Sequence, residues 1–217
     1  MPVLAKGHRR VRRGSAEDHA DLRQQVIAAA FAIHERDGIQ AMSMRALAGD
    51  LGLSPMALYR YFTSKADLLR ALGEVAMTEA ELTVSAAIAD EPSARARLRI
   101  ATESFIDYWE ARPARFRLFY MTPETMEPET ATQMVKSPNY RRSVALAASL
   151  STDLIAEVGG DRKKGLLARD LHTALMVGYL HSRIINVRFP WHDFKALRQS
   201  VIETIVAGVE QCVRKSK

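Results

Sequence analysis

Residue types that cross-link a fold or interrupt its helices are scarce in this chain. A single cysteine, Cys212, occurs in 217 residues, so no disulfide can form within the chain, which fits a reducing compartment such as the cytosol. Proline (8) and glycine (11) are also few, which removes the main helix breakers and favours helix over sheet. Strand-like alternation of polar and apolar residues is missing as well. The expected fold class is therefore all-α.

Long apolar segments are missing too. The basic N-terminus lacks the apolar stretch of a secretory signal. Unbroken apolar runs such as Val26–Ile33 are far too short to span a bilayer. With 47% apolar and 26% charged residues, the composition is that of an ordinary globular protein. We expect a cytoplasmic protein with no membrane partner.

The residue patterns of common enzymes are also lacking. The six histidines form no i,i+4 pair and no metal-binding motif, and no glycine-rich loop suited to phosphate occurs. Cys212 lies near the C-terminus without an evident catalytic partner. We expect no enzyme activity, no metal and no cofactor.

Positive charge is concentrated at the start of the chain. Of the net charge of +6, five charges are carried by residues before the first acidic residue, Glu17, namely Lys6, Arg9, Arg10, Arg12 and Arg13. Residues 1–17 also lack periodicity, so we expect a disordered basic arm. Such an arm either follows nucleic acid or serves only as a solvated tail.

Helical periodicity begins after this arm. The first predicted helix, about 18–37, carries one apolar stripe and ends before Gly38; the stripe is Leu22, Val26, Ala29, Ala30 and Ile33. Two short helices are then predicted, Ser43–Leu51 and Ser54–Tyr61, each opened by a capping serine and separated by a turn at Gly52. A longer helix is predicted from Ser64 to about Ala89.

The two short helices have the residues that a helix-turn-helix requires. Ala48 is small enough for close helix crossing, Gly52 tolerates the turn, and Leu58 locks the second helix. Further core residues are Leu47, Leu51 and Leu53. By spacing alone, an ordinary helical hairpin remains the alternative.

The residues that follow resemble the signature of the tetracycline-repressor (TetR) family of bacterial transcription regulators. The resemblance lies in Leu58–Lys65 (LYRYFTSK) with Asp67-Leu68-Leu69, and upstream in Ala29-Ala30, Gly38 and Ser43–Ala48 (SMRALA). It covers about residues 22–70, and His34 departs from the large apolar residue usual in that family. It implies a three-helix DNA-binding domain (18–66), a larger helical domain (67–217) for dimerisation and ligand binding, and about nine helices.

Docking of the second short helix in the major groove would give its neighbours distinct roles. The residues nearest the bases are Arg45, Pro55, Met56, Ala57 and Arg60. Most of these are apolar or small, which favours shape fit and thymine-methyl contacts. The expected phosphate contacts are Tyr59, Tyr61 and Lys65, with hydroxyl contacts from Ser43 and Ser54. In a dimer, two such helices about 34–36 Å apart would read a palindrome.

Further helices are predicted over the remaining two thirds of the chain. Their expected ranges are 93–111, 113–121, a long helix that contains Pro138 and ends near Val158, 161–188 and 193–214, with a loop at 121–130. Small and apolar residues on the last two helices predict a four-helix dimer interface, formed by Ala174, Gly178, Ser182, Val201, Ile205 and Val209. The alternative is that both helix faces pack internally in a monomer. Aromatic and methionine side chains predict either an apolar ligand pocket or a plain core, the pocket residues being Phe105, Trp109, Phe116, Tyr120, Met176 and Tyr179.

The resemblance implies a regulator, most naturally a repressor, that binds a palindromic operator as a homodimer and is released by a small molecule. Ligand binding would shift a two-state equilibrium in which the spacing of the two DNA-reading heads differs. The alternative is a structural or chromosome-organising DNA-binding protein of the same fold, without a ligand.

Overall fold

The computed structural model describes residues 16–121, 132–133 and 136–214. The predicted arm before residue 16 and most of the predicted loop at 121–130 lie outside the described residues. The described residues form nine α-helices and one short 3-10 helix and contain no strand, as the all-α prediction requires. They divide into two compact units, one ending at Lys65 and one beginning at Ala66.

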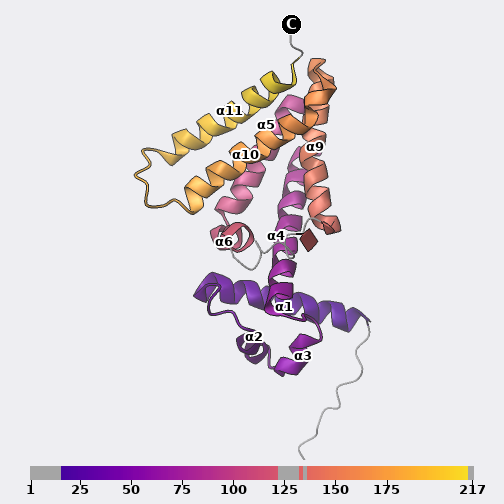
Figure 1. Cartoon of the computed structure of the whole chain (residues 1–217), viewed down its shortest axis with the longest axis vertical. Helices are drawn as coiled ribbons and strands as arrows, with labels where there is room; N and C mark the ends of the chain where they lie inside the picture. Colours follow the sequence, from indigo (N-terminus) through magenta and orange to yellow (C-terminus); the bar gives the residue numbers. More distant parts are fainter. Residues whose placement is uncertain (1–15, 122–131, 134–135, 215–217) are drawn as a thin grey trace, which may run out of the picture. The chain divides into compact units, whose positions relative to one another are not determined.

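The first unit consists of α1 (Ala16–Asp37), α2 (Met44–Asp50) and α3 (Pro55–Tyr59). Within it, α1 lies across the pair formed by α2 and α3 (Figure 1). The buried residues of α1 include Val26, Ala30 and Ile33, so the predicted stripe is its core face. Gly38 follows with φ of +80°, the left-handed conformation that glycine adopts at little cost.

The second unit begins with α4 (Lys65–Ile88), whose first residue is assigned to the first unit, and continues with α5 (Ala94–Glu110) and α6 (Pro113–Met121). It is completed by α9 (Pro138–Val158), the 3-10 helix η1 (Arg162–Lys164), α10 (Gly165–Ile184) and α11 (Phe194–Val213). Helices α10 and α11 lie side by side, and α5 and α9 both pack against them (Figure 1).

Local signals account for most helix ends. The hydroxyls of Ser93 and Ser137 accept hydrogen bonds from Ala96 N–H at 3.3 Å and Tyr140 N–H at 3.2 Å, which satisfies amides that a helix start leaves open. Pro138 occupies the first turn of α9, and Gly159 ends that helix with φ of +63°. The helix predicted at 161–188 is shorter than expected, because its start is 3-10 and α10 ends at Ile184.

Candidate nucleic-acid interface and ligand cavity

The turn between α2 and α3 is built from serine caps and one glycine. Ser43 Oγ accepts from Ala46 N–H at 3.1 Å, and Ser54 Oγ accepts from Ala57 N–H at 3.2 Å. Gly52 has φ of +65°, which allows the chain to reverse between the two helices. The second helix is shorter than the predicted 54–61, because α3 ends at Tyr59 and Arg60 is its C-cap.

A fully buried core holds the helix pair. Leu47, Ala48, Leu58 and Phe62 have no exposed surface. The guanidinium of Arg23, on α1, lies 4.9 Å from the centre of the Phe62 ring, a cation–π contact. The residues chosen as scaffold from the sequence therefore fix α2 and α3 within their unit.

The side chains predicted to face DNA bases mostly lie at the surface of this unit. Arg45, Pro55, Met56 and Arg60 are exposed, and Met56 keeps 76% of its surface. Ala57 is half-buried, so it can contribute to DNA binding only by letting the helix approach the bases closely. An exposed methionine and two exposed arginines on the same helix pair are available to a partner rather than to the protein core.

The side chains predicted to bind phosphate are held in different ways. Tyr59 is 47% exposed, whereas Tyr61 is half-buried with its ring centre 5.4 Å from that of His19. Lys65 Nζ donates to the carbonyl of Ile39 at 3.4 Å, and its other two N–H groups remain for a phosphate. The contact of His19 with Tyr61 was not foreseen, because the two residues are 42 positions apart in sequence.

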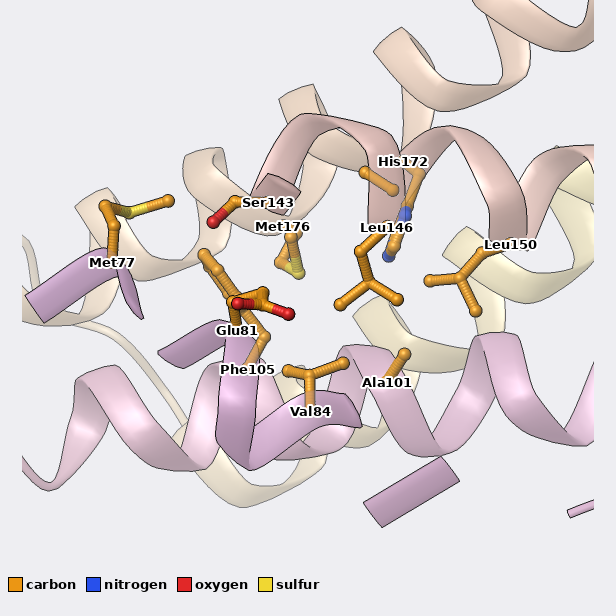
Figure 2. A pocket seen from close by; sticks show the side chains of 11 residues that line it. Met77, Glu81, Val84, Ala101, Phe105, Ser143, Leu146, Leu150, His172 and Met176 are labelled. Carbon is orange, nitrogen blue, oxygen red and sulfur yellow. The ribbon is translucent and has the colours of Figure 1, made fainter. Parts of the chain in front are cut away.

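The second unit contains a small inner cavity and a larger outer cleft. The cavity has a volume of about 60 Å³ and the cleft one of about 670 Å³. They share five lining residues and therefore adjoin: Met77, Phe105, Ser143, Ala147 and Met176. Figure 2 shows the side chains of α4, α5, α9 and α10 that surround the inner cavity.

Only half of the predicted ligand residues line these spaces. Phe105 and Met176 line both, and Tyr120 lines the outer cleft. Trp109 and Phe116 instead are fully buried and pack against each other with ring centres 5.7 Å apart, so they form core behind the site.

Tyr179 was also predicted to bind ligand but belongs to a different surface. It lines a groove between α10 and α11, and its hydroxyl donates to Glu110 Oε1 at 2.9 Å. Burial, reinforced by this carboxylate, raises the pKa of the Tyr179 hydroxyl. Tyr179 therefore has a structural partner and does not reach the cavity or the cleft.

Three polar side chains line the otherwise apolar inner cavity: Glu81, Ser143 and His172. The Thr102 hydroxyl donates to Leu98 O at 2.7 Å and lies 3.0 Å from His172 Nε2. Because a hydroxyl has one proton, it must accept from Nε2–H, which leaves Nδ1 of His172 as an acceptor. Burial lowers the pKa of His172 to about 4, so the ring is neutral at pH 7.

Sequence reasoning did not single out Glu81 or His172. Each is a polar residue among apolar neighbours on its helix, in the stretches AELTV and DLHTALM. A lone polar residue within an apolar stripe was the available signal, but its meaning depends on which helices meet there.

The groove between α10 and α11 has a volume of about 420 Å³ and contains four of the six predicted interface residues, Ala174, Gly178, Ser182 and Val201. Ile205 and Val209 are fully buried within the single chain. Because a partner cannot reach them, they belong to the core of the protomer and not to an interface. Leu197, Ser200 and Thr204 take their place along the groove.

Residues 16–121, 132–133 and 136–214 contain neither a metal cluster nor a membrane-spanning helix. In these ranges, no group of three or more histidine, cysteine or acidic residues is placed to hold a metal ion. Among the described helices, none combines the length and apolar character needed to cross a bilayer.

Comparison with known proteins shows which family the N-terminal part of the chain is similar to. Residues 26–72 match the family model of bacterial regulatory proteins, tetR family. The chain is 30% identical over 123 residues to the HTH-type transcriptional activator FasR of Mycolicibacterium smegmatis, covering 57% of this chain and 56% of FasR. It is 29% identical over 97 residues to the nucleoid occlusion factor SlmA of Haemophilus influenzae, covering 44% of each chain. The match thus spans about half the length of these curated relatives.

Solved structures extend the likeness to the whole fold. A protein of unknown function from Rhodococcus sp. RHA1 superposes with a TM-score of 0.73 at 21% identity, covering 93% of this chain and 98% of the other. The transcriptional regulator FadR from Bacillus subtilis, in complex with stearoyl-CoA, gives 0.70 at 18% identity, covering 85% and 98%. At such identities the likeness concerns the fold alone.

Proposed function

We propose that this chain, which belongs to the tetR family of bacterial regulatory proteins, is a transcriptional regulator that binds a palindromic DNA operator as a homodimer. The observation that carries the proposal is the exposed tip of α2 and α3. There Arg45, Met56 and Arg60 are exposed over a core with no exposed surface. A helix-turn-helix of this form enters the major groove with the N-terminus of its second helix.

Specificity would come mainly from shape and from the two arginines. Pro55, Met56 and Ala57 offer no side-chain donor, so they can contact thymine methyl groups but cannot read hydrogen bonds. Arg45 and Arg60 are the groups that can bind guanine edges, while Tyr59, Tyr61 and Lys65 hold phosphates. Because several phosphates are contacted, affinity would fall steeply as salt concentration rises.

Release from the operator would be controlled by a small molecule in the second unit. Helix α4 supplies Met77, Glu81 and Val84 to the inner cavity, and the same helix begins at Lys65, a proposed phosphate contact. A ligand that favours one position of α4 would thus bias the DNA-bound state. It acts only if it binds the two states with different affinities.

A structural DNA-binding role without a ligand is the second candidate, and the similarity to the nucleoid occlusion factor SlmA favours it. The two candidates differ in what the cavity does. A regulator would lose operator affinity when the cavity is filled, whereas a chromosome-organising protein would bind many genomic sites irrespective of small molecules.

The proposed docking is tested by substituting one base-facing and one phosphate-facing side chain. Arg60→Ala is expected to weaken operator binding by about 1–3 kcal/mol and to relax specificity at one base pair. Lys65→Ala is expected to weaken binding to all sequences and to lower the salt slope by about 1. Both effects are measurable by fluorescence anisotropy with labelled DNA.

The matched control is Arg36→Ala, which removes an exposed arginine of α1 that pairs with Asp37 at 2.7 Å and with Asp50, the last residue of α2, at 4.0 Å. This variant is expected to bind operator as the unaltered chain does. Unchanged affinity in both Arg60→Ala and Lys65→Ala would contradict the assigned docking.

A further inference from the structure

We propose that the inner cavity selects an amphiphile whose head donates hydrogen bonds, a hydroxyl or a protonated amine, and rejects the same hydrocarbon bearing a carboxylate. The inference deepens the proposed function, since it assumes that the cavity is the effector site. The inference concerns only the chemical class of the ligand. It rests on the polar atoms of the cavity wall.

Glu81 places an acceptor in the cavity. Its side chain is 14% exposed, and Figure 2 shows its carboxylate at the centre of the ring of lining side chains. One oxygen accepts from Ser85 Oγ at 3.3 Å, and the other lies 3.9 Å from Nε of Arg142, whose side chain is 58% exposed. An exposed pair at that distance offsets little of the charge. A second carboxylate beside Glu81 would be repelled in a region of low dielectric.

His172 lines the same cavity from another helix. The residue is 2% exposed, its Nε2–H is engaged by Thr102, and its Nδ1 has no partner within the described part of the chain. An unsatisfied buried acceptor costs on the order of 1–3 kcal/mol, which a ligand O–H or N–H would offset. Glu81 therefore favours a ligand that donates a hydrogen bond, and a donor that reaches Nδ1 of His172 would gain a second bond.

The sizes of the two spaces set the orientation of the ligand. The inner cavity of about 60 Å³ can hold a few water molecules, which suits a small terminal group such as CH₂–OH or CH₂–NH₃⁺. The hydrocarbon would continue past Met77, Phe105 and Met176 into the outer cleft. Insertion of a methyl end would desolvate Glu81 further without adding a donor to it, which is unfavourable.

The selectivity is tested with three probes of equal chain length on the full chain without DNA: 1-octanol below its aqueous solubility, and octylamine and octanoate below their critical micelle concentrations. Isothermal titration calorimetry is expected to show octanol and octylamine binding at least tenfold more tightly than octanoate. If octylamine binds more tightly than octanol, the ammonium group gains from the charge of Glu81. If the two affinities are equal, hydrogen bonding alone accounts for them. Both results support a ligand head that donates hydrogen bonds.

Variants then assign the selectivity to the cavity. Glu81→Gln is expected to weaken octylamine at least tenfold while changing octanol less than threefold, so octanol also reports an intact fold. His172→Phe is expected to weaken octanol about fivefold or more. Glu103→Gln is the matched control, since Glu103 pairs with Arg99 at 3.8 Å and does not line the cavity; it should change none of the three affinities.

Three results would overturn the inference: octanoate binding as tightly as octanol, none of the probes binding, or Glu81→Gln leaving the octylamine affinity unchanged. Operator binding measured on the same preparations separates this failure from that of the proposed function. Intact DNA binding together with any of these three results refutes the ligand class alone, whereas loss of all specific DNA binding refutes the proposed function.

Discussion

In the second unit, the neighbours of a side chain decide whether it belongs to the core, to the cavity wall or to the surface. The cluster around Trp109 has every ring in contact with another ring, and the Trp109–Tyr108 centres are 5.0 Å apart. Trp109 and Phe116 at its centre are fully buried core, whereas Phe105 and Tyr120 at its edge line the cavity and the cleft. Glu103 and Asp107 of α5 form ion pairs with Arg99 at 3.8 Å and Arg198 at 2.6 Å.

The buried imidazole of His172 makes stability depend on pH in a defined direction. Its pKa is lowered by burial from 6.5 to about 4, so between these values the unfolded chain binds a proton that the folded chain does not. Stability is therefore complete above about pH 6.5, falls as the pH decreases, and levels off below about pH 4. The full difference corresponds to roughly 3 kcal/mol.

Chemical denaturation between pH 4 and 7 measures this dependence. The variant His172→Gln, which cannot titrate, is expected to show a flatter profile than the unaltered chain over that interval. Identical slopes in the two proteins would mean that His172 titrates normally and that its assigned environment is wrong.

At the scale of elements, local sequence was sufficient to locate the helices. Serines at 43, 54, 93 and 137 supply side-chain caps, and glycines at 38, 52 and 159 adopt positive φ, so these helix ends carry their own signals. Where the cap is weaker the prediction failed: η1 precedes α10, and Lys164 makes no side-chain cap bond.

The cavity and the interface were predicted less completely, for a physical reason. Lining the cavity requires α4, α5, α9 and α10 to meet, and which residues face inward is decided by their packing. Periodicity shows that Ile205 and Val209 share an apolar face of α11, but it cannot show that the same chain already covers this face.

The junction after α9 gives a sharp test of packing between elements. A Cβ added at Gly160 would lie 2.6 Å from the carbonyl oxygen of Val213, and the next residue, Asp161, donates its N–H to that oxygen at 2.7 Å. Gly160→Ala is therefore expected to destabilise the fold by about 1–3 kcal/mol in urea denaturation.

Gly49→Ala is the matched control for this junction. A Cβ at Gly49 meets nothing within 4 Å, and the residue lies within α2, so alanine is expected to stabilise the helix by up to about 1 kcal/mol. Equal stability of the Gly160→Ala variant and the unaltered chain would show that the end of α11 is displaced from Gly160.

At the scale of the whole molecule, the proposed recognition of an operator requires two copies of the chain. One helix-turn-helix contacts only a few base pairs, so an operator of useful specificity needs a second. The groove on α10 and α11 is the surface we propose for that contact, since Gly178 and Ala174 are exposed there and permit close approach of helices.

Filling that groove tests the dimer. Gly178→Arg introduces a long charged side chain at an exposed position with no neighbour within 4 Å, so the protomer tolerates it but a partner helix does not. Sedimentation velocity is expected to show a monomer for Gly178→Arg and a dimer for Ala145→Arg, an equivalent change at an exposed position of α9. A persistent Gly178→Arg dimer would place the interface elsewhere.

The most direct test of the central claim is selection of DNA bound by the full chain from a random pool, followed by sequencing. The account predicts enrichment of an inverted repeat whose half-site centres are about 10 base pairs, or a multiple of one helical turn, apart. Enrichment of a single unrepeated site, or of no sequence at all, would contradict a dimeric helix-turn-helix regulator.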